Sequence, residues 1–139
     1  MSKPDKYQIQ LQQEIDCKAS FMNATKWMYL FSMLKKKNPP YMVSVKLLLE
    51  DEIRELSVPD TTDFIHKKYL EAYWGVFELK EIEWILIPSE IRYERKNREE
   101  ALAPKVKFQN MGMLEQALLA GKQYEYERSA VGLKVYGYK

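Results

Sequence analysis

The chain has 139 residues, of which 46% are hydrophobic and 30% charged, a composition typical of a globular protein and not of a disordered one. Its 22 basic and 20 acidic residues leave a net charge of +2, which is too balanced to predict binding to nucleic acids or membrane surfaces. The single cysteine, Cys17, excludes an intramolecular disulfide and a cysteine-based zinc site.

The N-terminal residues 1–5 contain no apolar stretch of the kind found in signal peptides. The apolar runs, such as residues 45–49, are far too short to cross a membrane. A lone thiol fits a reducing compartment. We therefore expect a cytoplasmic protein without membrane contacts.

The first predicted element is a helix within residues 5–20, where Tyr7, Leu11 and Ile15 recur every four residues. A short strand is the alternative, because Tyr7, Ile9 and Leu11 also alternate. The Gln, Glu and Lys residues between them favour the helix.

A second helix is expected over residues 24–36. Asn23 is a suitable N-cap, and Trp27 begins a series of apolar residues spaced by three and four. The segment Asn38-Pro39-Pro40 ends the helix, because proline cannot continue it and restricts the residue before it.

Strands are expected in the middle of the chain. Residues 41–49 and 53–58 form a hairpin across the turn Glu50-Asp51-Glu52. A short helix is expected over residues 63–69. Residues 73–79 and 82–87 form a second predicted hairpin around Lys80-Glu81, and the apolar character of its second strand indicates a central strand covered on both faces.

The C-terminal part begins with a charged stretch, residues 88–104, that we expect on the surface. A short strand follows around Val106 and Phe108. Asn110 is expected to cap a helix over residues 111–122, and a closing strand runs through residues 133–137, where apolar and polar residues alternate.

Strands joined by tight turns are antiparallel. The order of elements therefore predicts a single α+β domain over residues 1–139, with a mainly antiparallel sheet of about five strands and helices packed on one face.

Three short segments carry a family resemblance. They are Asn23-Ala24-Thr25-Lys26-Trp27, Glu81-Ile82-Glu83-Trp84 and Val135-Tyr136-Gly137-Tyr138. In this order they resemble the DUF6678-like family of small bacterial proteins of unknown function. The resemblance implies a bacterial cytosolic domain and supplies no catalytic residue. Proteins of this size and type often act as immunity partners of secreted toxins. Relative to the family pattern, residues 1–20 look like an N-terminal helical extension and residues 89–109 like a charged insert.

The sequence offers little for catalysis. The one histidine, His66, lies beside Lys67 and Lys68 and near Asp63, and is most simply a surface side chain. Cys17 has no evident histidine partner. The scattered glycines form no phosphate-binding loop. We expect no catalytic residues, no cofactor and no metal site.

Paired carboxylates are the best chemical candidates. Glu81 and Glu83 are expected on the same face of one strand, where they could support acid–base chemistry or Mg²⁺ binding. A solvated strand face is the simpler interpretation, and a hydrolase built on this pair is the least favoured hypothesis. The turn Glu50-Asp51-Glu52 is most simply a polar turn.

Aromatic residues suggest contact surfaces. Trp27, Trp84 and Tyr136 are expected in the core. Tyr124 and Tyr126 lie in a predicted polar loop or edge strand, and tyrosine is favoured at protein interfaces, although partly buried packing tyrosines are the simpler interpretation.

The favoured hypothesis is a non-catalytic protein–protein interaction domain, specifically an immunity-type protein that binds and neutralises a cognate toxin. Its candidate contact residues are Glu50, Asp51, Glu52, Glu55, Glu78, Glu81, Glu83, Tyr124 and Tyr126. The alternative is a module that binds a small ligand or nucleic acid through the sheet or through the basic residues Arg95 and Arg98. Nucleic acid is disfavoured because acidic residues are interspersed with the basic ones.

Overall fold

The computed structural model describes residues 5–36, 42–59, 64–93 and 105–139. Within these ranges the elements are α1 (Lys6–Asp16), α2 (Ala24–Lys35), β1 (Met42–Leu47), β2 (Ile53–Ser57), β3 (Phe64–Ile65), β4 (Tyr69–Ala72), β5 (Gly75–Glu78), the 3₁₀ turn η2 (Leu79–Glu81), β6 (Ile82–Pro88), β7 (Glu90–Tyr93), β8 (Lys105–Phe108), α3 (Met111–Ala120), β9 (Tyr126–Ser129) and β10 (Gly132–Tyr136).

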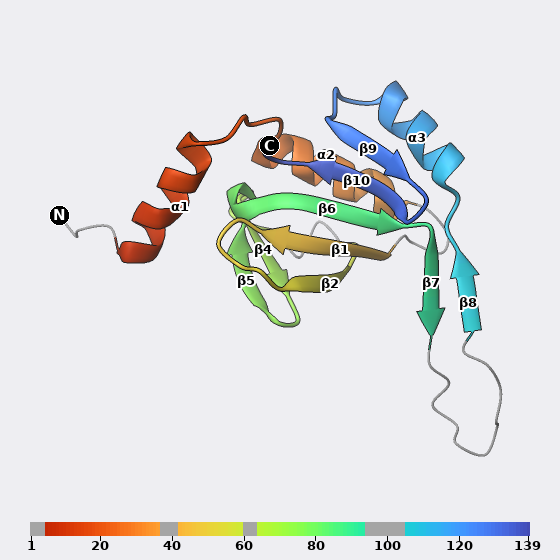
Figure 1. Ribbon diagram of the computed structural model, residues 1–139, viewed down its shortest axis with the longest axis horizontal. Helices are drawn as coiled ribbons and strands as arrows, with labels where there is room; N and C mark the ends of the chain where they lie inside the picture. The colour runs from red at the N-terminus through yellow and green to blue at the C-terminus, as the bar shows by residue number, and fades with distance from the viewer. Residues whose placement is uncertain (1–4, 37–41, 60–63, 94–104) are drawn as a thin grey trace, which may run out of the picture.

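The main sheet has five strands in the order β2-β1-β6-β10-β9, and every neighbouring pair is antiparallel (Figure 1). Two smaller antiparallel sheets, β3-β4-β5 and β7-β8, accompany it. The predicted α+β fold with a five-stranded antiparallel sheet is confirmed, and β6 is the central strand, as its apolar character indicated.

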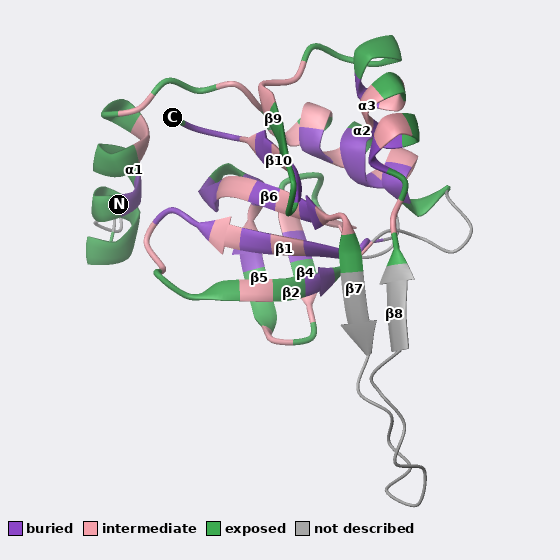
Figure 2. Cartoon of the chain, turned by 45° about the vertical axis from the view of Figure 1, so that its right-hand side comes forward, coloured by how far each residue is buried: buried purple, intermediate pink, exposed green. Residues whose placement is uncertain are grey.

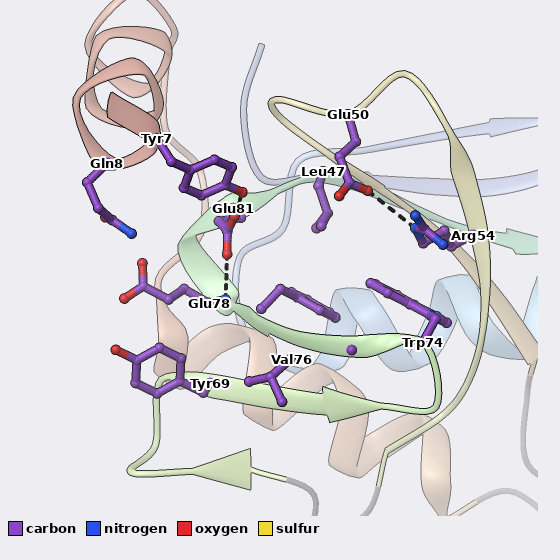
Figure 3. A pocket seen from close by; sticks show the side chains of 12 residues that line it. Tyr7, Gln8, Leu47, Glu50, Arg54, Tyr69, Trp74, Val76, Glu78 and Glu81 are labelled. Atoms are coloured by element: carbon purple, nitrogen blue, oxygen red, sulfur yellow. Dashed lines mark hydrogen bonds and ion pairs between the residues drawn. The ribbon is translucent and has the colours of Figure 1, made fainter. Parts of the chain in front are cut away.

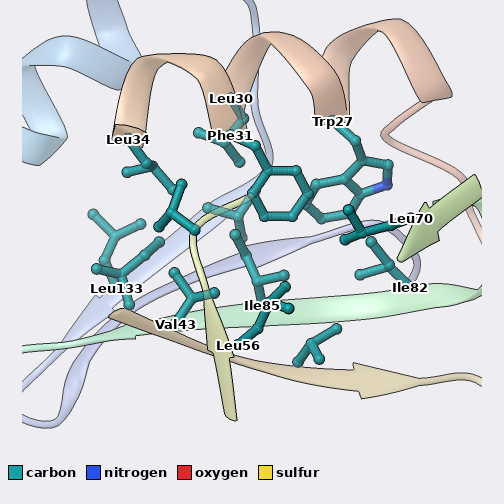
Figure 4. Close-up of a cluster of buried hydrophobic side chains, with 14 of the residues drawn as sticks. Trp27, Leu30, Phe31, Leu34, Val43, Leu56, Leu70, Ile82, Ile85 and Leu133 are labelled. Carbon is teal, nitrogen blue, oxygen red and sulfur yellow. The ribbon is translucent and has the colours of Figure 1, made fainter. Parts of the chain in front are cut away.

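Helices α2 and α3 lie on the same face of the main sheet (Figure 1). Trp27, Phe31 and Leu34 of α2 pack onto sheet residues that include Ile85 and Leu133, and all of these side chains are at most 3% exposed (Figure 4). The small sheet β3-β4-β5 completes this core from beside α2, with the buried side chains of Leu70 and Phe77. Burial of this apolar face is the main favourable contribution to the fold.

The opposite face of the sheet is only half-buried, so the expectation that β6 is covered on both faces is wrong. Trp84 and Leu86 of β6 are intermediate in exposure, in contrast to the buried Ile85 (Figure 2). Lys134 lies 4.2 Å from the centre of the Trp84 ring. Trp84 and Tyr136 pair across the strands on this face. Only Trp27 of the three expected core aromatics is therefore fully buried.

The segment predicted as a short helix over residues 63–69 is a hairpin from Phe64 onward. Strand β3 pairs with β4, and the chain reverses through His66 and Lys67, whose φ angles are 52° and 58°. This left-handed backbone is uncommon for residues other than glycine. Because no glycine marks this turn, the local sequence gave little indication that the chain reverses direction at His66 and Lys67. His66 is exposed, as expected.

The predicted hairpin of residues 73–79 and 82–87 is also wrong. Strand β5 pairs with β4 across a turn at Tyr73 and Trp74, whereas β6 pairs with β1 and β10. The 3₁₀ turn η2 separates β5 from β6 and places them in different sheets. Gly75, with a φ of 146°, allows the chain to leave this turn in a conformation that other residues rarely adopt.

The predicted starts of α2 and α3 are confirmed. The side chains of Asn23 and Asn110 accept hydrogen bonds from the backbone N–H groups of residues 26 and 113, as N-caps do.

The N-terminal segment is helical as α1, which excludes the alternative strand. Helix α1 lies beyond the end of the main sheet (Figure 1), where its one buried residue, Leu11, packs with Leu48 and Tyr138.

The charged stretch starts as a strand. Residues 90–93 form β7, which pairs with β8, and the predicted strand at residues 106–108 is confirmed. Residues 94–104, with Arg95 and Arg98, lie outside the described residues, as does Asp63. In the described part of the chain, no helix has the length and apolar character needed to cross a membrane.

Candidate functional site

A cavity of about 370 Å³ lies where α1, the β1–β2 turn, β4, β5 and η2 meet (Figure 3). We call it the acidic pocket. Its lining residues are Tyr7, Gln8, Leu47, Glu50, Arg54, Tyr69, Trp74, Gly75, Val76, Phe77, Glu78 and Glu81. The pocket thus combines three carboxylates with one guanidinium and several aromatic rings.

Glu81 is the most buried charged residue in the described part of the chain, with 6% of its surface exposed. One carboxylate oxygen accepts a 2.7 Å hydrogen bond from the backbone N–H of Glu78. The other accepts a hydrogen bond from the Tyr7 hydroxyl. The two bonds tie η2 and α1 together, so Glu81 has a structural role at the base of the pocket.

Burial raises the pKa of the Tyr7 hydroxyl above its usual value, and the hydrogen bond to Glu81 and the nearby Glu81 charge raise it further. The tyrosine ring as a whole is 41% exposed, but its hydroxyl end faces the carboxylate of Glu81 (Figure 3). Tyr7 therefore remains protonated and a hydrogen-bond donor at neutral pH.

Arg54 forms one wall of the pocket. Its Nε lies 3.3 Å from a Glu50 oxygen and an Nη lies 3.2 Å from a Glu52 oxygen. The guanidinium carbon lies 4.9 Å from the centre of the Trp74 ring, and Trp74 stacks on Phe77 at 5.1 Å. Because these side chains are in contact, the wall presents an aromatic surface with a preorganised charge pair.

Glu78 has an unusual environment. Its Oε2 is buried and accepts no hydrogen bond from the described residues, although the Lys80 ammonium lies 3.4 Å away. This oxygen retains its capacity to accept a hydrogen bond, while the Lys80 ammonium offsets part of its charge. In the described part of the chain, no three His, Cys, Asp or Glu residues form a metal-binding group.

The predicted carboxylates are divided between several places. Glu50 and Glu81 meet in the pocket, together with Glu78. Asp51 is exposed in the turn. Glu52 contacts the pocket only through Arg54.

Glu81 and Glu83 do not share a strand face, so that expectation is wrong. Glu81 belongs to η2, whereas Glu83 lies in a β-bulge of β6, opposite no residue of β1. Glu83 pairs with Lys46. The bulge breaks the alternation of side chains on which the prediction relied.

The tyrosines predicted as contact residues lie elsewhere, beside α3. Tyr126 belongs to the edge strand β9 and donates a 3.2 Å hydrogen bond to Glu115. Burial raises the pKa of Tyr124 to about 12, and its hydroxyl has no hydrogen-bond partner among the described residues. Both tyrosines are half-buried and pack against the core. The structure does not bring them to the acidic pocket.

Of the residues that line the pocket, only Glu50, Glu78 and Glu81 were candidates from the sequence. The residues that were missed include Tyr7, Arg54 and Trp74. The spacing of Glu50 and Arg54 was a weak signal of an ion pair. Gly75, directly after Trp74, indicated a turn, because glycine is common in turns. Neither signal indicates that α1 reaches η2, because Tyr7 and Glu81 are 74 positions apart.

The three segments that carry the family resemblance meet at one point, which we call the signature junction. The carbonyl of Glu83 accepts hydrogen bonds from the N–H groups of Gly137 (2.8 Å) and Tyr138 (3.1 Å). A Cβ on Gly137 would lie 2.4 Å from the Ile82 oxygen and 3.1 Å from the Trp27 ring. Only glycine fits there, which gives these segments a structural reason to occur together.

The family of unknown function DUF6678 has a model that matches residues 11–139 of the chain. No curated protein and no solved structure matches the chain.

Proposed function

The chain belongs to the family DUF6678, which brings no known activity with it, and we propose from its geometry that it is a non-catalytic protein-binding domain. In this proposal the acidic pocket receives a basic side chain of a protein partner. The partner is a bacterial toxin that the chain neutralises in the cytoplasm.

The observation that carries the proposal is the composition of the acidic pocket. Three carboxylates, on Glu50, Glu78 and Glu81, line the pocket together with one guanidinium, that of Arg54, and the Lys80 ammonium lies 3.4 Å from Glu78. The balance of charge attracts cations. The rings of Tyr69 and Trp74 offer flat surfaces beside the carboxylates, and a guanidinium stacks well on such rings while it pairs with a carboxylate.

The residues that line the pocket also include no nucleophile with a histidine partner. Glu81 uses both oxygens in internal hydrogen bonds, and the lining contains no histidine or cysteine. A nucleophile needs a base within hydrogen-bond reach. These features favour recognition over catalysis. An inhibitor that presents carboxylates to a basic cleft works by the same electrostatic complementarity.

The first experiment uses the product of the gene immediately upstream as the candidate partner. We expect the purified protein to retain it in a pull-down and to protect cells that co-express it. If the protein neither binds this gene product nor protects the cells, the proposal that the chain neutralises a toxin encoded next to it is wrong.

The second experiment locates the binding surface by calorimetry with the captured partner. Glu50→Lys should weaken binding at least tenfold, because it places a cation where the partner's cation binds. Glu71→Lys is the matched control, since it makes the same charge change at an exposed position of β4 outside the pocket. Equal affinities for the two variants would show that the partner binds elsewhere.

A further inference from the structure

A second cavity, of about 250 Å³, lies between the start of α2, η2 and the C-terminal residues. It is lined by Met22, Asn23, Ala24, Trp27, Lys68, Glu78, Lys80 and Tyr138. Only Glu78 also lines the acidic pocket. The two cavities differ in charge, because two lysines oppose the one carboxylate here.

Trp27 contributes an unused hydrogen-bond donor to this cavity. The side chain is 2% exposed and its ring stacks on Phe31 at 5.9 Å. The indole nitrogen lies at the end of the ring that points away from Phe31 (Figure 4). This N–H makes no hydrogen bond to another described residue, and its nitrogen is not among the fully buried side-chain atoms that lack a partner. An indole N–H can only donate, so a ligand that enters the space lined by Trp27 can bind it through an acceptor.

The positive end of α2 faces the same space. Asn23 caps the helix through its side chain and lines the cavity, and the first turn of a helix presents N–H groups and a partial positive charge. Lys68 forms no ion pair with any described residue; its ammonium lies 5.1 Å from the centre of the Tyr69 ring. Lys80 lies 3.4 Å from Glu78 and offsets that carboxylate. The remaining electrostatic preference is for an anion.

We propose that this cavity binds a small organic anion, with a carboxylate directed at the Trp27 N–H and Lys68. Met22, Ala24 and the Tyr138 ring supply an apolar surface for the rest of the molecule. The volume is slightly below the usual range for drug-sized ligands, so the ligand class is a single-ring or short-chain carboxylic acid. This site is separate from the proposed recognition of a basic side chain and does not depend on it.

The test is an NMR titration of the ¹⁵N-labelled full chain with benzoate. The chain has three tryptophans, and their indole N–H signals are assigned with the variants Trp74→Phe and Trp84→Phe. We expect the Trp27 indole signal to shift in a saturable manner, because its N–H gains an acceptor. The Trp74 and Trp84 signals serve as internal controls and should stay in place. Butylammonium, of opposite charge, should leave the Trp27 signal unchanged.

Variants identify the charge that holds the anion. Lys68→Gln should weaken benzoate binding about tenfold, because a hydrogen bond to a charged group is among the stronger ones. Lys122→Gln is the matched control, since Lys122 is exposed and lies outside this cavity. The proposal is overturned if the Trp27 signal does not move at about 10 mM benzoate, well above the millimolar affinity expected of such a small ligand. Equal binding by the two variants, or a shift of the Trp27 signal with butylammonium, overturns it as well.

Discussion

The signature junction and the acidic pocket lie near each other at the same end of the main sheet, but they use their polar groups differently. In the signature junction, backbone groups are paired: the Glu83 carbonyl accepts two hydrogen bonds, and the Gly137 carbonyl accepts a 2.9 Å bond from the N–H of Phe21. In the acidic pocket, side-chain charges face a cavity, and one oxygen of Glu78 has no hydrogen bond from the described residues.

The difference separates what holds the fold from what is available for binding. Substitutions in the junction have no space to relax into, because the core is packed at high density. Substitutions at the rim of the pocket change charge with little change in packing. The signature junction therefore explains why the three family segments occur together in the fold. The rim of the acidic pocket includes residues outside those segments, such as Glu50 and Arg54.

The largest effect is expected for Gly137→Ala in the signature junction. The new methyl group would lie 2.4 Å from the Ile82 oxygen, and overpacking of this kind costs about 3 kcal/mol in the free energy of unfolding. Gly112→Ala is the matched control, because its nearest contact is at 3.5 Å within a helix, where alanine is favoured over glycine by roughly 0.5–1 kcal/mol. Urea unfolding measures both, and similar stabilities would contradict the structural role of the junction.

A smaller effect is expected for Leu11→Ala, which weakens the attachment of α1 to the pocket. Leu11 is 1% exposed and packs in a small cluster with Leu48 and Tyr138, so we expect its truncation to cost about 2 kcal/mol, the lower end of the range for buried leucines. Because Leu11 is the only buried residue of α1, hydrogen exchange should accelerate in α1 and remain slow in β6. Ile9→Ala, at a position 46% exposed, should leave both rates unchanged. Uniform acceleration across the sheet would show that α1 is part of the same cooperative unit.

Alkaline pH should destabilise the contact between Tyr7 and Glu81. The folded chain holds the pKa of Tyr7 above the unfolded value of 10, so above pH 10 the unfolded state loses a proton that the folded state keeps. The contribution of Tyr7 to the free energy of unfolding is therefore fully present below pH 10 and is lost as the pH rises above it. Tyr124, whose pKa is about 12, adds to the same decline.

The variant Tyr7→Phe isolates this contribution. It should make the loss of stability above pH 10 shallower than in the parent chain, as followed by urea unfolding at several pH values. Tyr73→Phe, at a side chain 87% exposed, is the control and should keep the parent slope. If stability decreases with pH as steeply in Tyr7→Phe as in the parent chain, the Tyr7 hydroxyl does not cause the loss of stability above pH 10.

The smallest effect on stability is expected for Glu50→Gln at the rim of the pocket. The ion pair with Arg54 is partly exposed, and such pairs contribute about 0–1 kcal/mol. The melting temperature should therefore stay close to that of the parent chain, while affinity for the captured partner falls. A large loss of stability with unchanged affinity would show that Glu50 stabilises the fold and does not contact the partner.

Local signals predicted much of the fold. The side chains of Asn23 and Asn110 cap the helices where expected, because a cap is a contact between residues three positions apart. The alternation in residues 133–137 predicted β10, because one of its faces is buried. These features depend on neighbours in the chain, and sequence patterns report them directly.

The acidic pocket was predicted only in part. Glu50, Glu78 and Glu81 were named as candidates, but Glu81 was placed on a strand face with Glu83. A 3₁₀ turn and a β-bulge decide their positions, and both depend on which strands pair with β5 and β6. Strand pairing is a long-range choice, and periodicity within one strand carries no information about it.

The sequence by itself determined the presence of α1, α2 and α3, the caps of α2 and α3, most of the strands, the α+β class and the family. Tertiary structure alone decided that β5 pairs with β4, that Trp84 lies on the half-exposed face, and that Tyr7 meets Glu81 to close the acidic pocket. The physical reason is the range of the interactions. Capping and amphipathic periodicity act within a few residues, whereas the pocket and the signature junction bring together groups from distant parts of the chain.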